Sequence, residues 1–255
     1  MMTLHEKVLE WFYPGIVRLG LSPYDGTHAF YMHMNALLPE GAVLLDYGAG
    51  RGTTITIKDP WQQAMRCSRP KVIRRIGCDV DPVVLGNPHL DEAHVLTAAN
   101  GYRLPLADAS VDAVIMDWVV EHLPDPEASF ADVHRVLRPG GLLCLRTGNR
   151  FHYSYLIAAL VNGTALEKKL LRRAQADRAA HDVFPKLYRA NSRWSLRRHL
   201  RSAGFAAPVL IGWEPEAGYL NINAFTTLCG GVYHRLALIG LLPRATWMVF
   251  AIKAK

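Results

Sequence analysis

The chain has 255 residues, of which half are hydrophobic and 20% are charged, and its mean hydropathy is +0.05. This composition can bury a sizeable core and excludes disordered, collagen-like and coiled-coil chains. The longest apolar run, Leu236 to Leu242, is far shorter than the roughly 18 to 20 residues of a membrane-spanning helix, and the N-terminus lacks the pattern of a secretory signal. We therefore expect a cytoplasmic protein whose four separately placed cysteines are reduced thiols.

The net charge of +7 is concentrated in one segment. Between Lys168 and Arg201 there are 11 Lys or Arg residues against Asp177 and Asp182, a balance of +9, so the remainder of the chain carries −2. Clustered charge attracts an anionic partner more strongly than the same charge dispersed. A solvated helix face is the other interpretation of the segment, and both stay open.

Short apolar runs alternate with stretches that suit helices along most of the chain. The runs that read as strands are 43–46, 76–79, 94–97, 113–116, 142–145, 209–211 and 245–252. Helices are predicted from Asp125 to Leu137, where Pro139-Gly140-Gly141 would stop the helix, and from an N-cap at Ser192 to Gly204. Alternation of this kind predicts an α/β fold with a parallel sheet covered on both faces.

The most informative segment follows the first predicted strand. It reads Asp46-Tyr47-Gly48-Ala49-Gly50-Arg51-Gly52, and its glycines allow a ligand to approach the backbone closely. The carboxylate of Asp46 is poorly placed beside a pyrophosphate but suits a ligand with a charged amino group, such as the methionine part of S-adenosylmethionine. Asp79 ends the second predicted strand, where doubly wound folds use an acid to hold ribose hydroxyls.

Together with this loop, three further motifs resemble those of the class I S-adenosylmethionine-dependent methyltransferases, in the same order along the chain. They are the segments 100–106 (NGYRLPL), 110–114 (SVDAV) and 135–141 (RVLRPGG). The resemblance covers about Val43 to Thr147. It implies a Rossmann-like, mostly parallel seven-stranded sheet with helices on both faces and an inserted cap. A looser similarity of residues 146–153 and 182–191 is to a bacterial subgroup associated with polysaccharide and secondary-metabolite genes.

The resemblance also implies which residues bind the cofactor, S-adenosylmethionine. Asp46 and the loop would hold the methionine part, Asp79 the ribose, and Asn100 the adenine amino group, although the family has Asp at that last position. The segment after the fourth strand would line the methyl-transfer site. The residues expected to contact the cofactor are Asp46, Gly48, Ala49, Gly50, Asp79, Val80, Asn100, Gly101, Asp117 and Trp118.

We expect one domain with four segments. Residues 1–40 form a helical cover, 41–150 the cofactor-binding core, 151–190 the inserted cap, and 191–255 the C-terminal helix and last strands. An insertion at this point of an α/β fold usually lies over the carboxyl edge of the sheet, where ligands bind. The cap is therefore expected to form much of the substrate pocket.

Methyl transfer requires the acceptor to be aligned and, for a hydroxyl or amine, deprotonated. Histidine suits the latter role near neutral pH, and His122, His152 and His181 lie in or near the expected edge of the sheet. The candidate catalytic set is His122, His152, Tyr153 and Tyr188, with Arg189 as a further pocket residue. No Cys or His spacing indicates a metal site, so none is expected.

Three alternatives to methyl transfer onto a metabolite, sugar or lipid-linked acceptor remain. The same cofactor can donate its aminocarboxypropyl group or cyclise, which releases methylthioadenosine. The basic segment could contact nucleic acid, but no nucleic-acid partner is expected, because the chain lacks the N-P-P-Y or D-P-P-Y motif of nucleic-acid amino methyltransferases. The same segment, with Leu236 to Leu242, could contact a membrane surface. The oligomeric state is left open.

Overall fold

The computed structural model describes residues 2–52, 60–68, 71–161 and 185–255, and the chain divides into two compact units. Unit 1 comprises Met1–Ala29, Gly148–Pro185 and Gly212–Thr246. Unit 2 comprises Phe30–Thr147, Lys186–Ile211 and Trp247–Lys255. The predicted single domain and its four segments stay predictions. Of the predicted cap, residues 162–184 lie outside the described residues; they include His181 and residues 168–184, half of the basic segment.

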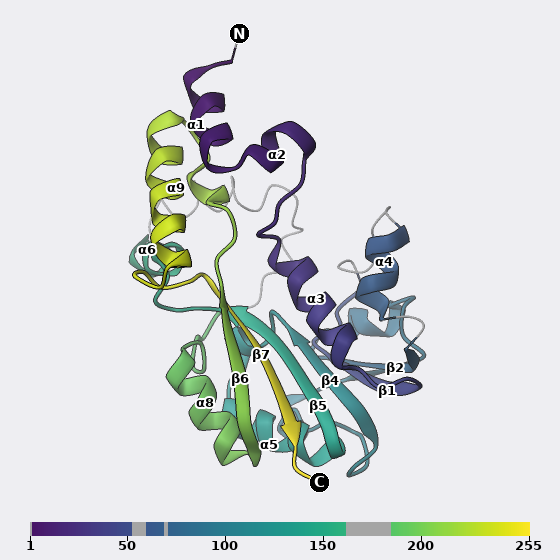
Figure 1. The fold of residues 1–255 in the computed structure, drawn as a ribbon. Helices are drawn as coiled ribbons and strands as arrows, with labels where there is room; N and C mark the ends of the chain where they lie inside the picture. Colours follow the sequence, from purple (N-terminus) through teal and green to yellow (C-terminus); the bar gives the residue numbers. More distant parts are fainter. Residues whose placement is uncertain (1, 53–59, 69–70, 162–184) are drawn as a thin grey trace. The chain divides into compact units, whose positions relative to one another are not determined.

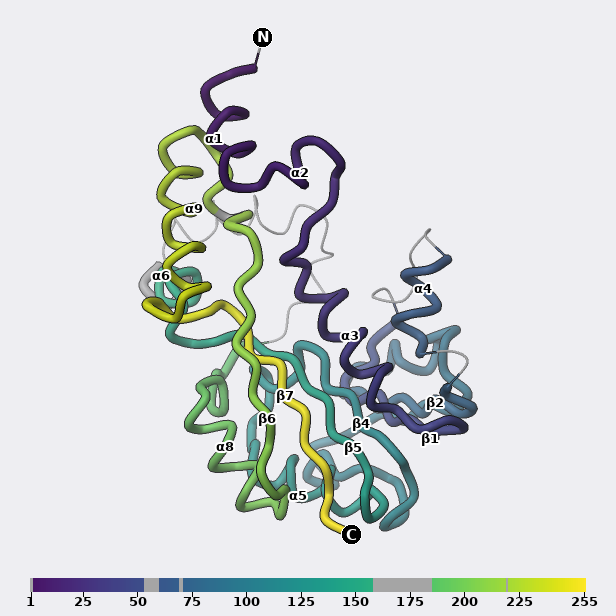
Figure 2. The backbone as a smooth tube through the Cα atoms, viewed as in Figure 1, coloured from purple at the N-terminus to yellow at the C-terminus, as the bar shows by residue number. Residues whose placement is uncertain are grey.

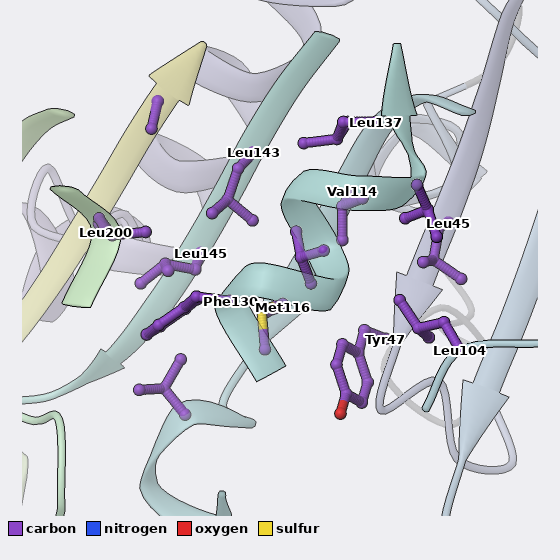
Figure 3. Close-up of a cluster of buried hydrophobic side chains, with 14 of the residues drawn as sticks. Leu45, Tyr47, Leu104, Val114, Met116, Phe130, Leu137, Leu143, Leu145 and Leu200 are labelled. Carbon is purple, nitrogen blue, oxygen red and sulfur yellow. The ribbon is translucent and has the colours of Figure 1, made fainter. Parts of the chain in front are cut away.

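Unit 2 is built on a seven-stranded sheet in the order β3-β2-β1-β4-β5-β7-β6 (Figure 1). The strands are β1 (Ala42–Tyr47), β2 (Val72–Asp79), β3 (Glu92–Val95), β4 (Val111–Asp117), β5 (Leu137–Gly148), β6 (Phe205–Trp213) and β7 (Thr246–Lys253). Strands β3, β2, β1, β4 and β5 pair in parallel, with Asp46 opposite both Gly77 and Ile115. The arrowheads of β5 and β7 point in opposite directions (Figure 3). The predicted mostly parallel sheet is confirmed.

The helices differ in which unit they belong to. Those of unit 2 are α4 (Pro60–Cys67), α5 (Pro126–Val136), α8 (Arg193–Ser202) and most of α3 (Gly26–Leu37). Those of unit 1 are α1 (Leu4–Phe12), α2 (Pro14–Leu19), α6 (Tyr153–Val161) and α9 (Ala224–Leu238). Within unit 1, α1 packs against α9, and the ring of Phe12 fills the space that a Cβ on Gly231 would need. No helix among the described residues is both long and apolar enough to cross a membrane.

The sheet has two apolar faces because side chains alternate along each strand. On one face, Leu45, Val114, Met116 and Leu145 pack against helices α5 and α8, and Phe130 of α5 lies beside Met116 (Figure 3). On the other face, Phe30 of α3 stacks on Phe250 of β7, with ring centroids 6.0 Å apart. Helix α3 therefore covers the face opposite α5 and α8, as the path of the backbone also shows (Figures 1 and 2).

Local sequence signals set the ends of the two predicted helices. Both are confirmed: the carboxylate of Asp125 accepts hydrogen bonds from the amides of Glu127 and Ala128, and Ser192 caps α8. The predicted end of α5 at Leu137 is also confirmed, since Leu137 is the C-cap of this helix. Leu137 is already extended and begins β5, so residues 139–141 lie within that strand. The third strand lies two residues earlier than predicted, because the carbonyl of Thr97 closes a tight turn with the amide of Asn100.

Candidate functional site

The glycine loop leaves β1 in a conformation that only glycine adopts easily. Gly48, Gly50 and Gly52 have φ values of +81°, +49° and +80°. A Cβ on Gly48 would lie 2.3 Å from Cγ2 of Val119, so this backbone passes directly against the segment after β4. The amide of Gly48 donates to the carbonyl of Cys78 at 2.7 Å. The loop is thus fixed between β2 and the end of β4.

Asp79, at the end of β2, is tied to this loop. Its Oδ2 accepts a hydrogen bond from the amide of Gly50 at 2.8 Å, and its Oδ1 accepts one from the amide of Asp81 at 2.9 Å. Burial raises the pKa of the Asp79 carboxyl above its ordinary value, although these amides oppose the shift. A carboxylate has about four lone-pair positions, and a position that the backbone amides leave unoccupied can accept from a ligand that donates hydroxyl groups.

Asp46 is held by Arg75, a residue that the sequence motifs do not include. Nη2 of Arg75, on the neighbouring strand β2, donates to Oδ2 of Asp46 at 2.6 Å. The side chain of Arg75 is almost completely buried, whereas that of Asp46 is 12% exposed. No other hydrogen bond to the Asp46 carboxylate is found within the described residues. One carboxylate oxygen is therefore engaged, and the other remains available.

The predicted adenine residues follow β3 on the surface of unit 2. Asn100 ends a single turn of 3₁₀ helix, and Gly101 continues from it with a φ of +65°. Both residues are exposed, as is Val80 after β2. The side chain of Asn100 makes no hydrogen bond among those found for the described residues. An exposed amide next to a left-handed glycine can meet a planar ring edge, because it carries both a donor and an acceptor.

Asp117, at the end of β4, belongs to a largely buried ionic cluster with Arg146, against which the more exposed Trp118 lies. Both oxygens of Asp117 accept from Arg146 of β5, from Nε at 2.7 Å and from Nη2 at 2.8 Å. The phenol of Tyr31, on α3, donates to Oδ2 of Asp117 at 3.1 Å. The guanidinium of Arg146 lies 5.4 Å from the ring centre of Phe30 and 5.3 Å from that of Trp118. Burial, with the carboxylates of Asp117 and Asp46, raises the pKa of Tyr31 well above its ordinary value.

A buried hydrogen-bond network around Glu121 lies next to His122 and Tyr188. Oε2 of Glu121 accepts from the hydroxyl of Thr147 at 2.7 Å, and that hydroxyl accepts from Asn191 at 2.6 Å. The carbonyl of Glu121 accepts from the amides of Leu187 and Tyr188. Burial raises the pKa of Glu121. The half-buried His122 and Tyr188 are therefore brought to one region through Glu121.

His152 and Tyr153 belong to unit 1, where their rings lie 4.2 Å apart. His152 is 3% exposed, and its two ring nitrogens contact Oγ of Ser154 at 2.7 Å and Oε1 of Glu214 at 3.2 Å. The second oxygen of Glu214 accepts from the amide of Ala245 at 2.6 Å. His152 is thus fixed by a buried carboxylate. Its catalytic role and that of Tyr153 stay predictions.

Within unit 2 the structure joins Gly50 to Asp79 directly and places Gly48 against Val119, next to Trp118 in the chain, whereas Asn100 and Gly101 lie on an exposed turn after β3. Sequence reasoning missed Tyr31, Arg75, Arg146, Glu121 and Glu214. Arg75 carried a signal, because β2 reads VIRRIGCD and successive side chains of a strand point to opposite faces. In a sheet that is covered on both faces, one of Arg74 and Arg75 must therefore be buried, and a buried cation must be paired. The other four depend on long-range contacts.

Arg189 donates to the carbonyl of Pro124. Within the described ranges, no group of three or more His, Cys, Asp or Glu residues is arranged to hold a metal ion.

Residues 45–145 match the family model of a methyltransferase domain. This part of the chain is a methyltransferase-family domain. A probable S-adenosylmethionine-dependent methyltransferase of Mycolicibacterium smegmatis is 40% identical over 86 residues, 32% of this chain and 32% of that relative. A malonyl-(acyl-carrier protein) O-methyltransferase of Hahella chejuensis is 32% identical over 108 residues, 41% of this chain and 36% of that relative. These matches span about a third of each relative's length.

The likeness in three dimensions extends further along the chain. A crystal structure of an S-adenosylmethionine-dependent methyltransferase from Archaeoglobus fulgidus has a TM-score of 0.56 at 18% identity, covering 89% of this chain and 92% of that one. At this identity the likeness concerns the fold alone. The chain has the Rossmann-like class I methyltransferase fold, as its sequence motifs predict.

Proposed function

We propose that this protein binds S-adenosylmethionine at the carboxyl edge of the unit 2 sheet and transfers the cofactor's methyl group to a small-molecule acceptor. The observation that carries the proposal is the arrangement at the ends of β1 and β2. Asp46, near the end of β1, has one carboxylate oxygen available and precedes the glycine loop. The loop is hydrogen-bonded through the amide of Gly50 to Asp79, the acid that ends β2. The family match over residues 45–145 and the names of the relatives support it.

The residues present fit the chemical groups of this cofactor. The available oxygen of Asp46 matches an ammonium group, and the remaining lone pairs of Asp79 match the ribose hydroxyls. The exposed amide of Asn100 matches the adenine edge, and Gly101 beside it leaves room for a ring. Because Gly48 and Gly50 carry no side chain, a ligand can lie directly on the loop backbone.

When bound, S-adenosylmethionine supplies a methyl carbon that its sulfonium makes electrophilic. The protein then needs to align an acceptor, exclude water and hold or move one proton. In unit 2, Asp117 and Trp118 would orient the acceptor, since Asp117 is fixed on both oxygens and the ring of Trp118 is 38% exposed. His122 and Tyr188 are the groups of this unit that we propose for proton transfer.

The acceptor is proposed to be a metabolite, a sugar or a lipid-linked molecule. The name of the Hahella chejuensis relative describes a carboxylate on a carrier-bound chain, which is consistent with a small acceptor group. Contact with a membrane surface through the basic segment is part of the same proposal for a lipid-linked acceptor; only its residues 185–201 lie in the described part of the chain. We propose a cytoplasmic location.

The test is mass spectrometry of the full chain incubated with S-adenosylmethionine, first alone and then with pools of sugars, lipids and small metabolites. S-adenosylhomocysteine that forms only with an acceptor, and is lost in Asp46→Asn, supports methyl transfer. Methylthioadenosine formed without an acceptor would instead assign cyclisation of the cofactor, and methylthioadenosine formed only with an acceptor would assign aminocarboxypropyl transfer. Absence of cofactor binding in a calorimetric titration would refute the whole proposal.

A further inference from the structure

Arg75 is a buried cation on β2, the second strand from one edge of the unit 2 sheet. It is 1% exposed and is flanked on β2 by Ile76, which is also buried, and by Arg74, which projects toward solvent and pairs with Glu92. Placing a guanidinium in an apolar interior is unfavourable unless it is paired and hydrogen-bonded. The position of this cation therefore requires a specific explanation.

Two hydrogen bonds that do not involve Asp46 hold Arg75 in place, one from its guanidinium and one from its backbone. Its Nη1 donates to the carbonyl of Arg66, in α4, at 3.1 Å. The backbone amide of Arg75 donates to the carboxylate of Asp91 at 2.6 Å, which fixes this point of β2. Arg66 and Asp91 thus anchor Arg75, so the donor Nη2 is held in a fixed position at the end of β1.

The Asp46 carboxylate receives that donor on one oxygen only. Nη2 of Arg75 lies 2.6 Å from Oδ2 of Asp46, and no second hydrogen bond to this carboxylate is found in the described part of the chain. The side chain of Asp46 keeps 12% of its surface exposed, so its carboxylate is not sealed inside the protein. Oδ2 of Asp46 is therefore anchored by Arg75, and Oδ1 is not engaged by that bond.

We propose that Arg75 is a positioning residue for the ligand's ammonium group, acting through Asp46. It locks Oδ2 and so presents Oδ1 in one orientation beside the glycine loop. This inference rests on the proposed function, because it takes an amino-acid-bearing nucleoside as the ligand. It adds a residue of β2 to the site, although Arg75 itself contacts no ligand.

A role in folding alone does not account for the pair well. Replacing a buried ion pair with apolar residues of similar volume is often neutral or stabilising, so such a pair is weak evidence of a contribution to stability. A fixed orientation of a binding carboxylate, in contrast, requires a partner that cannot move. Arg75 satisfies this requirement because its guanidinium has a second anchor at Arg66.

The experiment compares two probes that differ only in the amino-acid part. S-adenosylhomocysteine carries the ammonium group, and methylthioadenosine has the same adenosine and thioether without it. Dissociation constants of both are measured by calorimetry for the full chain and for the variants Arg75→Met, Arg75→Lys and Asp46→Asn. Arg74→Met is the matched control, because it removes a neighbouring guanidinium that is 54% exposed and faces solvent. Circular dichroism verifies that each variant is folded.

The expected result is a selective loss. Arg75→Met should weaken S-adenosylhomocysteine binding by roughly tenfold to a hundredfold, the range of one charge-assisted hydrogen bond, while methylthioadenosine changes less than about twofold. Asp46→Asn should show the same selectivity, and the double variant should lose no more than either single variant. Arg74→Met should behave as the wild type.

Other outcomes overturn the inference. Equal weakening of both probes, or no weakening of either, in a folded Arg75 variant would mean that Arg75 does not act through the ammonium site. Arg75→Lys decides the matter if Arg75→Met does not fold, and failure of both to fold assigns the pair to folding alone. A wild-type chain that binds neither probe would refute the proposed function itself, which distinguishes the two failures.

Discussion

Substituting Gly48 with alanine tests how tightly the glycine loop is built against β4. The new Cβ would lie 2.3 Å from Cγ2 of Val119, so the backbone or Val119 must move, and overpacking of this kind costs about 1–3 kcal/mol. The φ of +81° adds about 1–2 kcal/mol of backbone strain for any residue with a Cβ. Gly48→Ala should therefore lower the free energy of unfolding by about 2–5 kcal/mol, measured by urea unfolding followed by far-ultraviolet circular dichroism.

Two further variants separate the two causes. Gly50 also has a positive φ, but a Cβ added there would have only Oδ2 of Asp79 nearby, at 4.0 Å, so Gly50→Ala should show the strain of about 1–2 kcal/mol alone. Introducing Val119→Ala into Gly48→Ala should recover about 1–3 kcal/mol relative to the sum of the single effects. If Gly48→Ala is no worse than Gly50→Ala and Val119→Ala gives no recovery, the close approach of Gly48 to Val119 is wrong.

Three other predictions concern a hydrogen bond, a buried histidine and a helix cap. Tyr31→Phe removes one hydrogen bond to Asp117 and leaves Arg146 in place, so it should cost about 1–2 kcal/mol and lower turnover while cofactor affinity in a binding titration is kept; unchanged turnover would contradict this role. Burial lowers the pKa of His234 below 6.5, so as the pH falls through 6.5 the unfolded chain takes up a proton that the folded chain resists. Stability should then fall by up to about 1.4 kcal/mol per pH unit, and His234→Leu should make the pH dependence of urea unfolding less steep; parallel profiles would argue against this. Ser192→Ala removes the cap of α8 and should lower the unfolding free energy by about 1 kcal/mol, and an unchanged denaturation midpoint would show that the capping box contributes little.

Much of the unit 2 fold could be predicted because its signals are local. Apolar runs followed by acids and glycines indicated the strands and the loop, and caps at Asp125 and Ser192 set the starts of the two helices. The end of α5 at Leu137 was predicted as well, but the start of β5 was placed at residue 142, because the proline and glycines at 139–141 are typical of a turn and here lie within the strand. Strand β3 was misplaced because a backbone turn at Thr97, which many sequences can form, ends it.

The candidate site divides in the same way. Asp46, the loop glycines and Asp79 could be identified from sequence, because close backbone approach demands glycine and the end of a strand is a defined place for an acid. The partners of these residues could not. Arg75 is 29 positions from Asp46, and Tyr31 is 86 from Asp117, so only the register of β1 with β2 and the placement of α3 over the sheet bring them together. Sequence alone predicted which backbone could hold a ligand, and only tertiary packing decided which charges meet beside it, because those contacts join segments that are distant in the chain and whose local patterns do not depend on one another.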